Sequence, residues 1–153
     1  MKSSNKIEKL LWSIAFPGFG QILNKKYIKG AVLIVLEFVI NSNAHLNQII
    51  ILSFNGEILS SIEHTDYHWL MFYPCVYMFG MWDAYKDGGE TSPYAYLPYV
   101  VGAFFGTVGL IYSERLTIFG ILLGPVWMPM LFAFLGIGLG IAIFKLLNKQ
   151  MTF

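Results

Sequence analysis

The stretch FPGFGQILNKKYIKG, residues 16–30, decides how this chain is organised, because it interrupts the first apolar segment and then adds lysines. Pro17 cannot donate a backbone hydrogen bond, and Gly18 and Gly20 allow backbone conformations that other residues avoid. The apolar run that holds this turn, residues 10–23, would cover only about 21 Å as a helix. A helix needs about 20 residues to cross the roughly 30 Å hydrocarbon core of a bilayer. The pattern therefore predicts a short segment that dips into a membrane and turns back.

The composition of the chain lies outside the range of soluble proteins. Of its 153 residues, 56% are hydrophobic and 12% are charged. Roughly a quarter of the residues of a soluble domain are charged, so we expect a multi-pass membrane protein. The formal net charge is +1 and no basic stripe is present, which predicts no nucleic-acid partner. The single cysteine, Cys75, lies in an apolar run and is expected to be a buried, inert thiol.

The later apolar runs are long enough to cross a bilayer, and each predicts a transmembrane helix. An acidic polar segment, residues 54–66, separates the first two and lies outside. The last run is longer than a crossing requires, so it tilts, kinks at a proline or divides into two shorter pieces. A further kink is expected at Pro74. The predicted crossings are residues 30–53, 67–85, 94–112 and 118–144.

The positions of the lysines predict the topology, because cytoplasmic loops of membrane proteins carry an excess of Lys and Arg. If segment 10–23 turns back, all of the 10 basic residues except Arg115 lie on one side. If it crossed fully, Lys2, Lys6 and Lys9 would join Arg115 on the other side. The first arrangement fits the rule better. We therefore expect an all-α, polytopic helical membrane protein with about four transmembrane helices and a short N-terminal re-entrant or interfacial helix. Both termini are then cytoplasmic, and the protein belongs to the cell (cytoplasmic) membrane.

Residues 10–87 resemble the TM-two-type domains and related small bacterial membrane proteins. That pattern has Pro-Gly-x-Gly-Gln, then Asn, then Lys-Gly opening a transmembrane helix, with Asp-Ala-Tyr or similar at the close of the next helix. Leu23 and Lys25 depart from it, since the family usually has an aromatic residue before the Asn and a Gly after it. The polar segment 54–66 is also longer than the turn usual in the family. The matching positions are Pro17, Gly18, Gly20, Gln21, Asn24, Lys29, Gly30, Asp83, Ala84 and Tyr85.

The resemblance implies a bacterial multi-pass membrane protein, and it implies little about activity because the bacterial members are mostly uncharacterised. It divides the chain into a TM-two-like region, residues 1–93, and a C-terminal pair of transmembrane helices within residues 94–153. The second region lies outside the resemblance.

The basic end of the predicted topology holds a first candidate site. Lys29 and Asp83 end successive crossings on the same side, so an ion pair between them is expected. One interpretation is structural, with the pair fixing the relative depth of two helices. The other is a site for a lipid headgroup or a partner, in which lysines bind phosphate. Gln21 and Asn24 are expected to satisfy backbone groups that the broken helix leaves free. The candidate residues are Gln21, Asn24, Lys25, Lys26, Lys29 and Asp83.

A second candidate site is a polar stripe on the first crossing. Glu37, Asn41, His45 and Gln48 follow one another at spacings that place them on one face of a continuous helix. An intramembrane carboxyl group is costly enough to suggest a proton or cation path. The alternative is that the amides hydrogen-bond neighbouring helices while Glu37 is protonated or paired.

The remaining clusters indicate structure more than chemistry. His64 and His68 could share a helix face, but an outer interfacial segment is favoured over a metal site. Glycines at four-residue spacing permit close helix packing within the chain or self-association; they are Gly102, Gly106, Gly120, Gly124, Gly136 and Gly140. No nucleophile has a catalytic arrangement around it, and no phosphate loop or nucleotide fingerprint is present.

The sequence therefore predicts a small integral membrane protein that is not an enzyme and needs no cofactor or metal. Its expected role is that of an accessory or scaffold protein binding membrane lipids or membrane-protein partners. Self-association through Gly102, Gly106, Gly136 and Gly140 is a further expected contact. The alternative is a small transporter or channel subunit that uses the Glu37 stripe.

Overall fold

The computed structural model describes residues 2–150, and side chains from residue 5 onward. Within these residues the regular secondary structure is helical apart from one short β-hairpin, as expected for the all-α class. In chain order the elements are α1 (Lys2–Ala15), α2 (Phe19–Leu23), α3 (Tyr27–Ala44), α4 (Leu46–Phe54), α5 (Ile58–Glu63), α6 (Tyr67–Leu70), α7 (Tyr73–Asp87), α8 (Leu97–Tyr112), β1 (Thr117–Ile118), β2 (Ile121–Leu122) and α9 (Gly124–Gln150).

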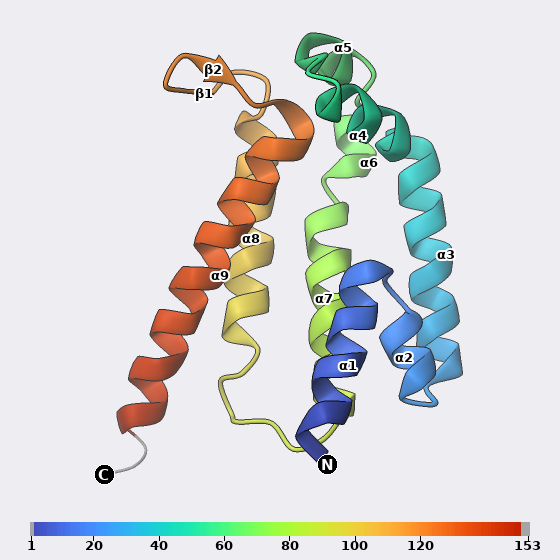
Figure 1. The fold of residues 1–153 in the computed structure, drawn as a ribbon, viewed down its shortest axis with the longest axis vertical. Helices are drawn as coiled ribbons and strands as arrows, with labels where there is room; N and C mark the ends of the chain where they lie inside the picture. The colour runs from blue at the N-terminus through green and yellow to red at the C-terminus, as the bar shows by residue number, and fades with distance from the viewer. Residues whose placement is uncertain (1, 151–153) are drawn as a thin grey trace.

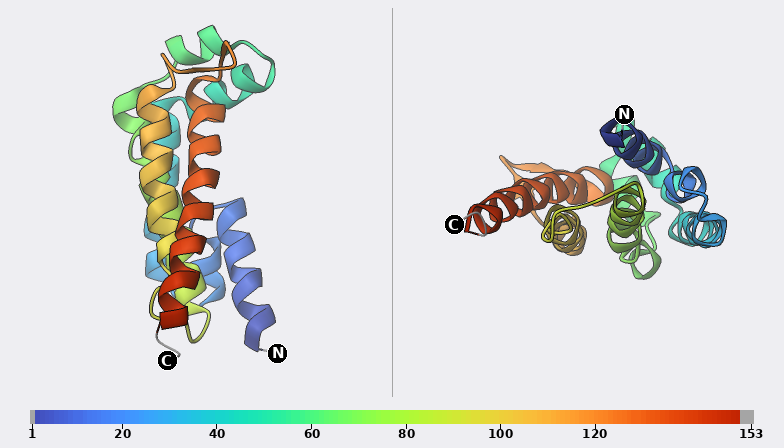
Figure 2. Two further views of the ribbon diagram at one scale, coloured as in Figure 1. Left: turned by 90° about the vertical axis from the view of Figure 1, so that its left-hand side faces the viewer. Right: turned by 90° about the horizontal axis from the view of Figure 1, so that it is seen from below.

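The long helices α3, α7, α8 and α9 run along the long axis of the molecule, and α4, α5, α6 and the hairpin lie at its upper end (Figure 1). Seen from below, the long helices form an open row (Figure 2). Each packs on its neighbour, α3 on α7, α7 on α8 and α8 on α9. An open row buries less helix surface than a closed bundle does. Large apolar side chains, such as Phe38, Phe104 and Phe134, are accordingly exposed.

The first helix, α1, does not extend along the full length of the molecule. From the lower end α1 rises beside α7, and the chain then turns and descends through α2 to the start of α3 (Figure 1). The turn lies at Pro17 and Gly18, the position that the sequence indicated. α9 also ends at the lower end, so both described ends of the chain lie at the same end of the molecule, on different sides of it (Figure 1).

Two helices among the described residues are long and apolar enough to cross a membrane. They are α3 with 18 residues and α9 with 27 residues. α8 is apolar but shorter, with 16 residues, and α7 has 15 residues. The structure thus supports two candidate crossings, where the sequence predicted about four.

Two predicted crossings have different boundaries because backbone breaks divide them. His45 adopts a left-handed conformation with φ 56°, so the run 30–53 is divided between α3 and α4. The run 67–85 is divided by a turn at residues 71–72, which precedes Pro74. Pro74 itself lies in the first turn of α7, where a helix tolerates the missing N–H, so the kink expected there is absent.

The last predicted crossing, 118–144, begins too early and ends too soon. Residues 117–122 form the antiparallel hairpin, with Thr117 opposite Leu122. Phe119 and Gly120 have positive φ values of 51° and 79°, which make the tight turn and stop a helix from starting there. α9 then continues without division to Gln150, with Pro129 inside it.

The apolar core lies toward the upper end, where α3, α4, α6, α8 and α9 meet. Its side chains are Ile40, Ala44, Leu46, Ile49, Leu70, Leu110 and Val126. Hydrogen bonds tie the covering segments to α9, since the Trp127 indole donates to the Ser53 carbonyl oxygen at 3.1 Å. The thiol of Cys75, in contrast, is exposed on the outside of α7, so the expectation of a buried cysteine is wrong.

The spaced glycines bring α8 and α9 together within the chain. A Cβ atom on Gly136 would lie 2.6 Å from the Val101 carbonyl oxygen, and one on Gly140 would lie 2.6 Å from the Pro98 Cα. On α8, a Cβ at Gly102 would lie 2.8 Å from Ile137 Cγ1. Side chains of any size would force the helices apart. These glycines thus permit close helix packing within the chain, which is one of the two alternatives that their spacing suggested.

Candidate functional site

The fold-back at the lower end is built on two glycines that have no room for a side chain. Gly18 has φ +105°, and a Cβ there would lie 2.6 Å from the Gly30 carbonyl oxygen. A Cβ on Gly20 would lie 2.1 Å from Ser13 Oγ and 2.7 Å from the Ala84 Cβ. The backbone of α2 is therefore held directly against α1, α3 and α7.

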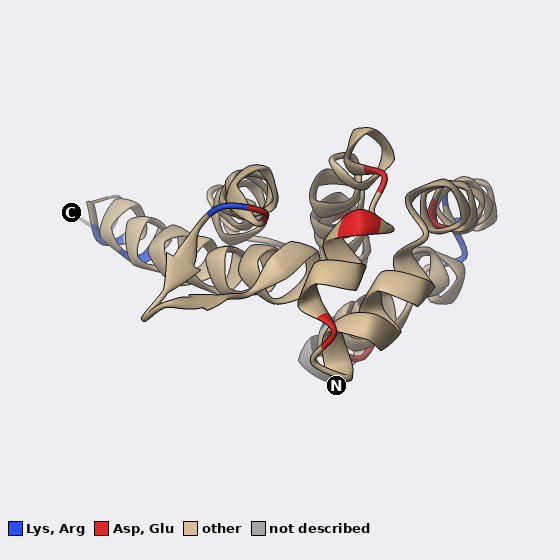
Figure 3. Ribbon diagram, turned by 90° about the horizontal axis from the view of Figure 1, so that it is seen from above, with Lys and Arg blue, Asp and Glu red and all other residues tan. Residues whose placement is uncertain are grey.

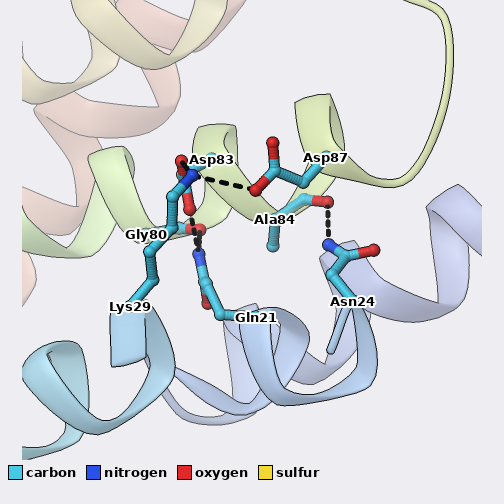
Figure 4. Close-up of polar contacts among 7 residues, drawn as sticks. All are labelled: Gln21, Asn24, Lys29, Gly80, Asp83, Ala84 and Asp87. Carbon is cyan, nitrogen blue, oxygen red and sulfur yellow. Dashed lines mark hydrogen bonds and ion pairs between the residues drawn. The ribbon is translucent and has the colours of Figure 1, made fainter. Parts of the chain in front are cut away.

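Gln21 uses this close approach to reach α7. Its side chain is fully buried, at 0% exposure. The amide Nε2 donates to the Gly80 carbonyl oxygen at 2.8 Å and to Asp83 Oδ2 at 3.1 Å (Figure 4). A neighbouring amide does the same one helical turn lower, since Asn24 Nδ2 donates to the Ala84 carbonyl oxygen at 2.8 Å.

These partners differ from those that the sequence suggested. Gln21 and Asn24 were expected to satisfy backbone groups of the broken helix itself. That backbone is instead satisfied by other backbone groups, with the Ile22 N–H donating to the Gly18 oxygen and the Lys26 N–H to the Gln21 oxygen. The two side-chain amides are thereby free to bind α7, and they join the fold-back to it.

Lys29 completes the cluster from the first turns of α3. Its ammonium lies 2.6 Å from Asp83 Oδ1, so the expected ion pair is present, and 2.9 Å from Asp87 Oδ2 (Figure 4). The side chain of Lys29 is 48% exposed, whereas those of Asp83 and Asp87 are 10% and 19% exposed. Two largely buried carboxylates thus share one half-exposed ammonium, and these three groups carry a net charge of −1.

Asp87 was not among the predicted site residues. It lies one helical turn beyond Asp83 on the same face of α7, and that four-residue spacing could have identified it. Lys25 and Lys26, which were predicted, remain exposed and outside the cluster. Lys25 has a left-handed backbone, φ 60°, in the turn between α2 and α3. The structure therefore brings together Gln21, Asn24, Lys29 and Asp83 but leaves Lys25 and Lys26 apart.

Some polar atoms near the fold-back are buried without a partner in the described part of the chain. They are Ser13 Oγ, Gln21 Oε1 and Asn24 Oδ1. A buried polar group without a partner costs free energy.

The predicted polar stripe is not one continuous face, because the helix breaks at His45. Glu37 is buried at 5% exposure against Tyr73 of α7, and its Oε2 atom has no partner among the described residues. Asn41 binds across the break, since its Nδ2 donates to Asn47 Oδ1 at 3.1 Å and its Oδ1 accepts from the Asn47 N–H at 3.3 Å. His45 and Gln48 are exposed.

The tip of the fold-back is joined to the same region of α7. The Tyr77 hydroxyl donates to the Ile14 carbonyl oxygen at 2.6 Å, near the end of α1. Tyr77 also stacks on Tyr73, with ring centroids 5.5 Å apart. Tyr77 therefore satisfies a carbonyl group that the end of a helix leaves free.

The histidines gather at the opposite, upper end of the molecule. His45, His64 and His68 line an open depression of about 440 Å³, together with Glu63 and Asp66. The Asp66 carboxylate accepts from the His68 N–H at 3.0 Å and thus caps α6. Within residues 2–150, no group of three or more His, Cys, Asp or Glu is arranged to hold a metal ion.

Comparisons of the chain with family models, curated proteins and solved structures found no match. The chain itself has a hydrogen-bonded and ion-paired polar cluster at the lower end, exposed lysines beside it and exposed apolar helix faces above it.

Proposed function

We propose that this chain is a small integral membrane protein that acts as an accessory or scaffold component and binds membrane lipids or other membrane proteins. The observation that carries the proposal is the exposure of its most apolar helices. In the most apolar window of α9 only 11% of the residues are buried, and in that of α3 only 28% are. A core helix of a soluble protein is buried on most of its surface, so these helices fit a lipid environment.

In the proposed topology α3, α7, α8 and α9 cross the cytoplasmic membrane of a bacterium, and α1 with α2 forms the re-entrant segment. The distribution of charge supports this orientation. Figure 3, viewed from the upper end, shows acidic positions on the segments that cover this end and a basic position next to β1. The lower end carries lysines just before α3 and in its first turn, namely Lys25, Lys26 and Lys29. The positive-inside rule expects such lysines on the cytoplasmic side, next to the lipid headgroups.

A non-catalytic role follows from how the polar groups are used. The cluster of Gln21, Asn24, Lys29 and Asp83 binds one part of the chain to another. Such a cluster holds α2 and α3 in fixed positions against α7, and it supports a TM-two-type scaffold. The exposed Lys25 and Lys26 lie beside it, where they can attract phosphate groups of lipids.

The competing hypothesis is a transporter or channel subunit that uses Glu37. The unpartnered Oε2 of this buried carboxyl group favours it. However, His45 and Gln48 are exposed and Asn41 is bound to Asn47, so the predicted stripe does not extend from Glu37 as a path.

The first test is membrane extraction followed by native mass spectrometry of the full chain. Alkaline carbonate should leave the protein in the membrane fraction, and release into the supernatant would refute an integral membrane protein. Gently extracted wild-type protein should retain lipid or a protein partner, and Lys29→Ala should retain less. A bare wild-type monomer would remove the support for a binding role, and ion flux through liposomes would then test the competing hypothesis.

A further inference from the structure

An apolar groove runs along the outside of the molecule between α3 and α7. It has a volume of about 500 Å³ and begins at Lys29 and Asp83. Above this charged end, apolar side chains of both helices line it, among them Val32, Leu36 and Phe79. The side chains of Val32 and Phe79 are 53% and 58% exposed, so the groove is open to its surroundings.

The length of the groove matches one leaflet of a bilayer. On α3 the lining residues extend from Ile28 to Leu36, which covers about 12 Å at 1.5 Å per residue. On the antiparallel α7 they extend from Asp83 back to Cys75. Half of a hydrocarbon core measures about 15 Å. The groove therefore leads from headgroup depth toward the middle of the membrane, as a lipid acyl chain does.

The charged end of the groove has one hydrogen-bond donor and one acceptor that are not yet used. An ammonium group has three N–H donors, and Lys29 gives two of them to Asp83 and Asp87. The Lys29 side chain is 48% exposed, so the third donor is accessible. Both oxygens of Asp83 accept hydrogen bonds, from Lys29 and Gln21, whereas Asp87 uses one oxygen, Oδ2, within the described part of the chain.

We propose that this groove binds a phospholipid with an amine headgroup, of the phosphatidylethanolamine class. Its acyl chain lies between α3 and α7, its phosphate accepts from Lys29, and its ammonium donates to Asp87. This inference rests on the proposed lipid-binding function and names the lipid.

The charge balance favours an ethanolamine headgroup over the other common headgroups. Lys29, Asp83 and Asp87 together carry a net charge of −1, which an anionic headgroup does not complement. A phosphate with an ammonium complements both signs. A choline headgroup has the same charge but no N–H to donate to Asp87. Lys25 and Lys26 do not line the groove and attract anionic lipids without selecting one.

The test compares lipid retention by native mass spectrometry after exchange into phosphatidylethanolamine, phosphatidylcholine or phosphatidylglycerol with the same acyl chains. Wild-type protein should retain phosphatidylethanolamine about tenfold better than the choline lipid, the equivalent of one charge-assisted hydrogen bond. Asp87→Asn should remove most of this preference. Equal retention of the three lipids by the wild type would overturn the inference.

A matched pair of substitutions on α3 locates the lipid. Val32→Trp fills the groove, whereas Val35→Trp places the same side chain at a position that is 60% exposed and outside the groove. Val32→Trp should lower retention of phosphatidylethanolamine about tenfold, and Val35→Trp should leave it unchanged. Equal retention by both variants would show that the lipid does not lie in this groove.

A measurement on the unaltered protein guards against misfolding of a variant. Cys75 is exposed, lines the groove and is the single cysteine of the chain. In detergent solution its reaction with a maleimide should be slower after addition of phosphatidylethanolamine than after addition of phosphatidylcholine with the same acyl chains, because a stably bound acyl chain covers the thiol. Equal rates would overturn the inference. If the wild type holds a different lipid or a protein partner, the proposed function stands without this inference, and release by carbonate would refute both.

Discussion

Gln21 donates a hydrogen bond to the Gly80 carbonyl oxygen at 2.8 Å, although the two residues are 59 positions apart in the sequence. The bond joins the short helix α2 to the middle of α7, and Gln21 is fully buried where it forms. The Pro-Gly-x-Gly-Gln motif thus packs the fold-back against the rest of the fold. Its glycines let the backbone approach α1, α3 and α7, and its glutamine hydrogen-bonds to α7.

Replacing Gln21 by Leu should destabilise the protein. The substitution removes two hydrogen bonds and leaves Asp83 Oδ2 without its amide donor. We expect a loss of about 1–3 kcal/mol, measured as a lower Tm of the detergent-solubilised protein. Gln48→Leu is the matched control, because Gln48 is exposed on α4, and its Tm should stay close to that of the wild type. Equal losses for both variants would show that the Gln21 bonds contribute nothing specific.

Two glycines of α9 should respond in opposite ways to the same substitution. A Cβ on Gly136 would lie 2.6 Å from the Val101 carbonyl oxygen, whereas a Cβ on Gly138 has nothing within 4 Å. Gly136→Ala should therefore cost about 1–3 kcal/mol by forcing α8 and α9 apart. Gly138→Ala should be neutral or stabilising by up to about 1 kcal/mol, through helix propensity. The Tm values of the two variants test this, and a stable Gly136→Ala would argue against the close α8–α9 contact.

Removing the charge of Lys29 should cost more than removing the charge of its partner Asp87. Lys29→Met leaves two largely buried carboxylates facing each other, whereas Asp87→Asn leaves the Lys29–Asp83 pair in place. Because Lys29 is half exposed, we expect about 1–2 kcal/mol for Lys29→Met and less than about 1 kcal/mol for Asp87→Asn.

The double variant Lys29→Met with Asp83→Asn provides the control for that comparison. It removes one of the two facing carboxylates and should be more stable than Lys29→Met alone. Unfolding of all four proteins in one detergent measures the difference. A double variant less stable than Lys29→Met would show that repulsion between the carboxylates is not the cause.

The lower end of the fold could be predicted from the sequence because its signals are local and strong. Pro17 and Gly18 mark the turn, and the opposite charges at Lys29 and Asp83 identify the pair that joins α3 to α7. The partners of Gln21 and Asn24 could not be predicted, because a side-chain amide fits any free donor or acceptor. Which one it meets depends on how α2 packs against α7.

The upper end could not be predicted, because apolar composition alone does not show where a helix breaks. His45 and Phe119 both adopt positive φ, which few side chains favour. Gly120 beside Phe119 permits a turn, but a single glycine in an apolar run is also common inside a transmembrane helix. His45 divides the run 30–53 and thereby interrupts the polar stripe. Phe119 forms the hairpin turn before α9.

Glu37→Gln distinguishes the scaffold from the transporter. The substitution keeps the shape of the side chain and removes its ability to gain or lose a proton. A scaffold should therefore keep its bound lipid or partner, and its free energy of unfolding should change by less than about 1 kcal/mol. Proton or cation flux in liposomes should be absent from both proteins. Flux that the wild type supports and Glu37→Gln abolishes, with folding intact, would favour the transporter.

Cysteine labelling of intact cells should place the fold-back on one side of the membrane. In a Cys75→Ser background, Glu57→Cys and Glu114→Cys put a thiol on exposed positions of the upper end, and Glu8→Cys and Lys26→Cys put one on exposed positions of the lower end. A membrane-impermeant maleimide should label the upper pair from outside and the lower pair after permeabilisation, because the proposed topology puts the lysine-rich end in the cytoplasm.

The informative position in that experiment is Glu8, since it lies on α1 before the turn. If segment 10–23 crossed the membrane, Glu8→Cys would be labelled from outside while Lys26→Cys stayed protected. A fold-back gives the same protection at both positions, because α2 returns the chain to the end from which α1 rises. Lys86→Cys, exposed near the end of α7, provides a reference that the proposed topology also puts in the cytoplasm and that does not depend on the turn. Labelling of Glu8→Cys alone among the lower positions would therefore refute the re-entrant segment and leave the remaining topology in place.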